Sequence, residues 1–274
     1  VAVGVAALTS DTLGSQSVAV GMNALTAQNM TTATNALNTA VGHAVGASIT
    51  TGIQNVLVGG LAGDALTDAD FNVAMGYGAL TADTLGSMSV AVGYTALGSQ
   101  NMTTATNTLN VGVGQAAGSA ITTGVQNTIV GGLAADALTD ADFNVAVGVQ
   151  ALGSDTQGSR STALGYYALL NQNFTTATNA HNTAVGYFAG AAVTTAISNT
   201  LLGALSGDAL STGSDNVAVG VASLSADTKG ALSVAIGSNA LTAQNFTTAT
   251  DTYNVAVGTL AGASVTTGIQ NTLV

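Results

Sequence analysis

The sequence lacks several residue types altogether, and each absence narrows the range of folds and functions. It has no cysteine, proline, tryptophan or glutamate, and Arg160 and Lys229 are its only basic residues. Without cysteine there is no disulfide framework and no thiol chemistry. Because the formal net charge is −11, the chain has too few cations to neutralise phosphates, so nucleic acids and anionic membrane surfaces are poor partners.

Long apolar runs are missing as well. No stretch of about 18 apolar residues could span a bilayer, and the first residues do not show the basic-then-apolar pattern of a signal peptide. The chain opens inside its own repeat motif and stops where the next motif glycine is due. We therefore expect the sequence to be a window of a longer protein, with targeting and anchoring segments outside it.

What is present favours β structure. The 274 residues include 35 glycines, and Val, Thr, Asn and Asp are frequent. Helices usually carry Glu, Lys and Arg on their solvent-facing side, whereas Val and Thr suit strands and Gly, Asn and Asp suit turns. The composition therefore predicts an all-β fold.

A five-residue motif recurs along the whole chain. It reads Ser-Val-Ala-Val-Gly at residues 17–21 and 89–93, and its final "marker" glycines stand at positions 4, 21, 42, 59 and 76, with spacings of 17, 21, 17 and 17 residues that then recur. Such a fixed period is typical of repeats that stack into one continuous core. We predict a single solenoid array over residues 1–274, with 72-residue super-repeats at 4–75, 76–147, 148–219 and 220–274, the last incomplete.

The length of one repeat, here called a rung, predicts a narrow coil. Seventeen residues offer about 56 Å of extended chain at about 3.3 Å per residue, which two strands of five or six residues and two turns would use. Asn or Ser stands four residues before every marker glycine, as at Asn55, Asn72 and Ser89. These short polar side chains can bond neighbouring backbone or stack on the equivalent residue of the next rung. We predict a parallel β-roll or β-solenoid.

Alternation along the motif predicts two strand faces. The residues before and after the central alanine share one face, and their apolar character assigns that face to the core at Val18, Val20, Val73, Met75, Val145, Val147, Val234 and Ile236. The central position is small and apolar in most rungs, which suggests close packing against another copy of the chain. We therefore predict a homotrimer with its inter-chain face at Ala19, Ala74, Ala91, Ala146 and Ala235.

The 21-residue rungs carry four extra residues, and insertions in solenoids form loops on one face. Met30, Met102, Phe174 and Phe246 begin these inserts and are expected to anchor them. We predict that the loops protrude at Thr31, Thr32, Thr103, Thr104, Thr175, Thr176, Thr247 and Thr248.

The motif resembles the head repeats of trimeric autotransporter adhesins and related repeats of bacteriophage tail fibres. The likeness rests on Ser233–Gly237 and on Asn182–Tyr187, and it extends over essentially the whole chain, although adhesin heads usually have shorter rungs. The resemblance implies a left-handed parallel β-roll in a homotrimer, with Val and Ile inside each roll and Ala near the inter-chain contact.

Candidate chemistry is sparse, and we predict no enzyme, cofactor or metal site. Residues 59–64 are similar to a calcium-binding glycine-aspartate repeat but have one residue too many. Asp68 with Asp70 fits a solvated acidic turn better than a cation site. His43 and His181 have no neighbouring ligands in the sequence, and no hydroxyl has a nearby base.

These observations predict a structural, extracellular fibre segment of a surface adhesin or filament, with copies of itself as partners. A bacteriophage tail-fibre segment for host attachment is the alternative. An ice-binding solenoid is a third hypothesis, disfavoured because the threonines that begin some strands are expected to point inward. Tyr77, Tyr94, Tyr166 and Tyr187 follow marker glycines and could contact glycans or a receptor, or fill a groove between chains.

Overall fold

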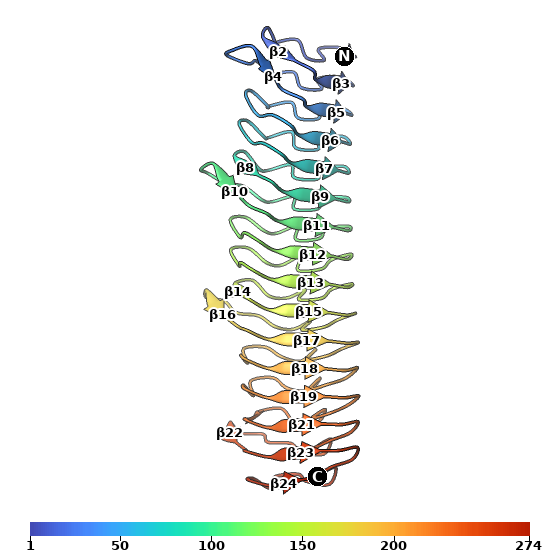
Figure 1. The fold of residues 1–274 in the computed structure, drawn as a ribbon, viewed down its shortest axis with the longest axis vertical. Coiled ribbons are helices and arrows are strands. Elements are labelled where there is room, and N and C mark those ends of the chain that lie inside the picture. Colours follow the sequence, from blue (N-terminus) through green and yellow to red (C-terminus); the bar gives the residue numbers. More distant parts are fainter. The chain divides into compact units, whose positions relative to one another are not determined.

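The computed structural model describes all residues from 1 to 274, which form two compact units, Val1–Asp140 and Ala141–Val274. Each unit is an all-β parallel solenoid without helices, in which one strand per rung lies beside the strand of the next rung (Figure 1). The first unit stacks its main sheet in the order β1 (Ala2–Val3), β3 (Val18–Val20), β5 (Thr39–Val41), β6 (Val56–Val58), β7 (Val73–Met75), β9 (Val90–Val92), β11 (Val111–Val113) and β12 (Thr128–Val130).

The second unit repeats this arrangement. Its main sheet runs through β13 (Val145–Val147), β15 (Thr162–Leu164), β17 (Thr183–Val185), β18 (Thr200–Leu202), β19 (Val217–Val219), β21 (Val234–Ile236), β23 (Val255–Val257) and β24 (Thr272–Leu273). Short strand pairs flank the inserts: β2 (Gly14–Ser15) with β4 (Thr34–Asn35), β8 (Gly86–Ser87) with β10 (Thr106–Asn107), β14 (Gly158–Ser159) with β16 (Thr178–Asn179), and β20 (Gly230–Ala231) with β22 (Thr250–Asp251).

The register confirms that equivalent motif residues stack on each other within each unit. Val73 pairs with Val90, Ala74 with Ala91 and Met75 with Val92, all in parallel. A rung does not hold two long strands, however, because its main strand has three residues at most. The predicted pair of five- or six-residue strands is therefore wrong, and most of the rung is built differently.

The wall opposite the sheet is made by residues with alternating backbone handedness. In the rung that starts at Gly21, Asn23 and Leu25 take φ values of 58° and 50°. The Asn23 N–H donates to the preceding rung at Val5 O, 2.9 Å away, and the Leu25 N–H donates to the following rung at Val45 O, 3.0 Å away. Left-handed residues interrupt any helix, so the segment instead forms a ladder with both neighbours.

The marker glycines are required by a close backbone approach. A Cβ placed on Gly76 would lie 2.3 Å from the carbonyl oxygen of Gly93, and the φ of Gly76 is 139°. Only a residue without a side chain satisfies both conditions without displacing the next rung. This explains why the glycine survives in every rung.

The polar residue four positions before the glycine forms the predicted ladder. The Asn55 N–H donates to Asn38 Oδ1 at 2.9 Å, and the Asn72 N–H donates to Asn55 Oδ1 at 2.9 Å. Each amide nitrogen also donates within the fold, as Asn72 Nδ2 does to Gly86 O at 2.9 Å. These side chains are fully buried, so the ladder satisfies polar groups that would otherwise be costly to bury.

The assignment of strand faces made from the sequence is inverted in the structure. The predicted inter-chain residues Ala19, Ala74, Ala91, Ala146 and Ala235 are all fully buried inside their own chain. The predicted core residues instead lie on the outer face, where Val18, Val20, Val73, Val147 and Val234 are half-buried and Met75, Val145 and Ile236 are exposed. The thin coil leaves room for little more than a methyl group at most central positions, so size and not hydrophobicity selects the inner residue.

In a few rungs a larger residue replaces the central alanine, and a glycine on the opposite wall makes room for it. Leu57 replaces the central alanine of β6, and its methyl carbons occupy the space where Gly46 and Gly63 would otherwise carry a Cβ, at 2.8 and 3.0 Å. Ile129 lies in the same way against Gly118. The rungs with central Ala74 and Ala91 instead carry a buried leucine on the opposite wall, at Leu80 and Leu97.

Candidate interaction surfaces

The surface offers no pocket, and no three His, Cys, Asp or Glu side chains are grouped so that they could hold a metal ion. His43 and His181 are both exposed. Asp68 and Asp70 form hydrogen bonds within the chain, since Asp68 Oδ1 accepts from Thr51 Oγ1 at 2.6 Å and Asp70 Oδ1 accepts from the Ile53 N–H at 2.7 Å. No helix is present that would be long and apolar enough to cross a membrane.

The interior contains a polar network that the sequence did not reveal. Once in each super-repeat an aspartate, a buried glutamine and the serine and asparagine of the ladder meet; the aspartate is fully buried at Asp83, Asp155 and Asp227 and half-buried at Asp11. Gln100 Nε2 donates to Ser89 Oγ at 2.8 Å and to Asp83 Oδ2 at 2.5 Å, while its Oε1 accepts from Asn110 Nδ2 at 2.9 Å. Equivalent sets are Asp11, Ser17, Gln28 and Asn38; Asp155, Ser161, Gln172 and Asn182; and Asp227, Ser233, Gln244 and Asn254.

This network closes the insert loop onto the coil. Asp83 Oδ1 accepts from the N–H groups of Gly86 and Met102, both at 3.0 Å. A carboxylate with three donors around it can be buried without a cation. The recurrence of Asp seventeen residues before Gln in every super-repeat was the available sequence signal, and the network is structural because every polar member is already bonded.

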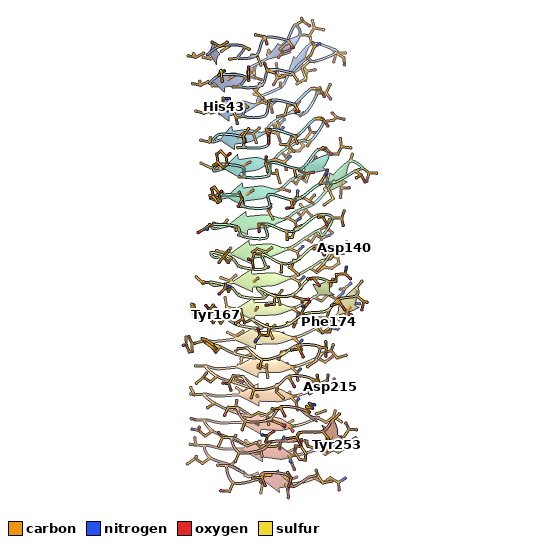
Figure 2. The ribbon with its side chains drawn as sticks, turned by 180° about the vertical axis from the view of Figure 1, so that it is seen from behind. His43, Asp140, Tyr167, Phe174, Asp215 and Tyr253 are labelled. Atoms are coloured by element: carbon orange, nitrogen blue, oxygen red, sulfur yellow. The ribbon has the colours of Figure 1, made fainter.

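The insert loops are anchored by their first apolar residue, as predicted. Met30, Met102, Phe174 and Phe246 are between 3 and 7% exposed. Figure 2 shows Phe174 on the insert side of the second unit, away from Tyr167. The threonines that follow are exposed: Thr31, Thr32, Thr103, Thr104, Thr175, Thr176, Thr247 and Thr248.

The outer face of each main sheet is apolar and free of charge. It consists of the first and third residues of each strand, which are Val or Thr and then Val, Leu, Ile or Met. None of the 13 aspartates, nor Arg160 or Lys229, occupies a position on this face. Met75, Leu164 and Ile236 are 42, 43 and 39% exposed. A contiguous apolar surface that continues over successive rungs is typical of an interaction surface.

Aromatic side chains flank this face after the marker glycines. Tyr77 and Tyr94 stack in the first unit with ring centroids 5.9 Å apart. In the second unit four rings gather on two neighbouring rungs, namely Tyr166, Tyr167, Tyr187 and Phe188. A hydrogen bond with the side chain of Tyr167 is the main cause that raises the pKa of Tyr166.

Comparison with known proteins does not identify what these surfaces bind. No family model, no curated protein sequence and no solved structure matches the chain.

Proposed function

We propose that this chain is a structural, non-catalytic segment of an extracellular fibre, as in a surface adhesin or filament, or alternatively a bacteriophage tail fibre. The observation that carries this proposal is the bare, charge-free outer face on a solenoid whose backbone groups are bonded from rung to rung. Repeat proteins of this kind extend by adding identical units, which suits a mechanical role.

The partner that best fits the outer face is another copy of the same chain. Two copies with a net charge of −11 each repel one another over most of their surface, but the outer face carries none of that charge. The face also repeats with the spacing of neighbouring strands, about 4.8 Å. A second copy has the same spacing, so its Val and Thr columns can meet these columns rung for rung.

The predicted homotrimer therefore remains our proposal, but with a different interface. The alanines are buried within each chain, and the contact is moved to the outer residues, such as Val73, Met75, Val90 and Val92. Burying these side chains between copies would stabilise the assembly by about 25 cal/mol for each Å² of apolar surface removed from water.

Sedimentation equilibrium of the purified chain tests this proposal. We expect a mass about three times the 26.4 kDa of one chain, and a lower mass for Val90→Asp, which places a carboxylate on the outer face. Thr104→Asp, on an exposed insert loop, is the matched control and should keep the wild-type mass. A wild-type chain that stays monomeric at high concentration would contradict the proposal.

One observation revives the ice-binding hypothesis as a second candidate. Thr162, Thr183 and Thr200 begin three successive strands and lie on the outer face, contrary to the expectation that such threonines point inward. Valine interrupts the column elsewhere, as at Val217 and Val234. Thermal hysteresis of the purified chain separates the two candidates, because a fibre segment would show none.

A further inference from the structure

The four-ring cluster of the second unit forms a compact and partly exposed aromatic surface. The centroids of Tyr166 and Tyr167 are 4.0 Å apart, those of Tyr187 and Phe188 are 4.5 Å apart, and Tyr167 lies edge-on to Phe188 at 5.0 Å. Tyr166 and Tyr187 remain 43 and 54% exposed. Figure 2 shows Tyr167 on the side of the coil to which the main strands point. We propose that this cluster is a binding site for a neutral oligosaccharide.

The cluster is local, which argues against a role in packing rung on rung. In the first unit Tyr77 and Tyr94 also follow marker glycines on neighbouring rungs, but Gly78 and Thr95 come after them, so that stack has two rings and not four. The periodic outer face does not need the additional rings of Tyr167 and Phe188. A surface that appears once in a repeating chain suits a discrete ligand.

The rings are also held in place before any ligand arrives. Tyr167 and Phe188 adopt left-handed φ values of 60° and 55°, and the Phe188 N–H donates to Tyr166 O at 3.0 Å. Each ring packs against at least two others. Tyrosine offers a large apolar surface with a hydroxyl at its tip and loses little entropy on binding.

The surroundings select an uncharged, amphipathic ligand. The neighbouring rungs place Val149 and Gln150 on one side and Ala204 and Leu205 on the other, as the bonds from the Tyr167 N–H to Val149 O and from the Leu205 N–H to Tyr187 O show. No charged residue stands at these positions, and the chain as a whole repels anions. Pyranose rings present C–H faces to aromatic rings and hydroxyls to tyrosine oxygens, which matches this surface.

Isothermal titration of the full chain with maltohexaose, cellohexaose and chitohexaose tests the proposal, and 3′-sialyllactose serves as an anionic probe. We expect at least one neutral hexasaccharide to bind and the anionic probe to bind at least about tenfold more weakly. Failure of all three neutral probes would overturn the proposal, as would equal binding of sialyllactose.

The decisive variant is Tyr167→Leu with Phe188→Leu. Leucine already occupies the same rung position at Leu133 and Leu205 with φ values of 56° and 57°, so the variant should fold. We expect about a tenfold loss of affinity, whereas Tyr94→Leu in the first unit should bind like wild type. Unchanged affinity in the double variant would refute the site. The site does not depend on self-association, and sedimentation of the same variant tells a lost fibre contact from a lost sugar site.

Discussion

The inner and outer faces of the same strands obey opposite rules of residue choice. In β21 the inner Ala235 is fully buried, while the outer Ile236 is 39% exposed. A globular sheet would place the larger apolar side chain inside. Here the opposite wall lies so close that the interior takes the smaller residue, and the larger residues lie on the outer face. Alternation therefore defines two faces, whereas the thickness of the coil decides which one is the core.

The largest difference in stability is expected between two variants that place a carboxylate on the inner face and on the outer face of the same strand. Ala235→Asp would bury a carboxylate with no donor provided for it, and we expect a loss of more than about 4 kcal/mol in the free energy of unfolding. Ile236→Asp leaves its carboxylate in water. That variant should keep the circular dichroism spectrum and cooperative unfolding of the wild type but sediment as a smaller species. Equal destabilisation of the two variants would mean that the faces are not distinct.

The fit between the two inner walls predicts the next largest effect. Leu57→Ala removes the side chain that lies against Gly46 and Gly63, and the cavity should cost about 2–5 kcal/mol. Gly46→Ala alone should also destabilise, because its Cβ would lie 2.8 Å from a Leu57 methyl carbon. The double variant Gly46→Ala with Leu57→Ala should therefore lose less than the sum of the two single losses in urea titrations. Strict additivity would show that these walls do not touch.

The buried polar network should give a smaller effect. Gln100→Ala leaves Asp83 Oδ2 and the amide of Asn110 each short of a partner, which we expect to cost about 1–3 kcal/mol. Gln115 is exposed and, like Gln100, is not in the left-handed region, so Gln115→Ala provides a control for the substitution itself. If the Gln100→Ala chain has the same melting temperature as the control variant, water replaces the missing hydrogen bonds.

Much of the fold could be predicted from the sequence because the repeat period fixes which residues stack. The marker glycines, the asparagine ladder and the anchoring role of Met102 all follow from that period and from elementary turn chemistry. The choice of inner face could not be obtained from hydrophobicity, since both faces are apolar. The signal that could have settled it is the exchange between positions: Leu57 and Ile129 replace a central alanine where the opposite wall has Gly46 and Gly118. Such compensation requires the two positions to share one interior.

The aromatic cluster and the polar network were harder to foresee for another reason. From the sequence, Tyr166 and Tyr187 were singled out only because they follow marker glycines. The contribution of Tyr167 and Phe188 depends on their left-handed backbone, which no propensity favours in an aromatic residue. The network depends on Asp83 and Gln100 turning inward from positions that carry Ile49 or Leu66 in other rungs. The amino-acid composition indicated neither the left-handed backbone of the two aromatic residues nor the inward orientation of Asp83 and Gln100.

The smallest expected effect concerns a position that differs between the two units. In the first unit Asp64 Oδ1 accepts a hydrogen bond from Thr81 Oγ1 at 2.5 Å, whereas in the second unit the equivalent Asp208 has a buried Oδ1 without a partner. Desolvation by burial raises the pKa of Asp208, and its own backbone N–H lowers it less. A carboxyl whose pKa is higher in the folded than in the unfolded chain favours folding while protonated, and that contribution is lost as the pH rises through the folded pKa.

Asp208→Asn should therefore raise the melting temperature slightly at pH 7 and lose this advantage as the pH falls through the raised pKa of Asp208 to the ordinary range of an aspartate. Because the side chain is partly exposed, solvent screening keeps the gain small. Asp64→Asn, whose amide oxygen can still accept from Thr81, should show no gain at either pH. Melting temperatures of the wild type and the two variants, recorded between pH 3 and pH 7, test this expectation. If Asp208→Asn still melts at a higher temperature than the wild type at pH 3, the missing hydrogen-bond partner of Asp208, and not its charge, is what lowers the stability.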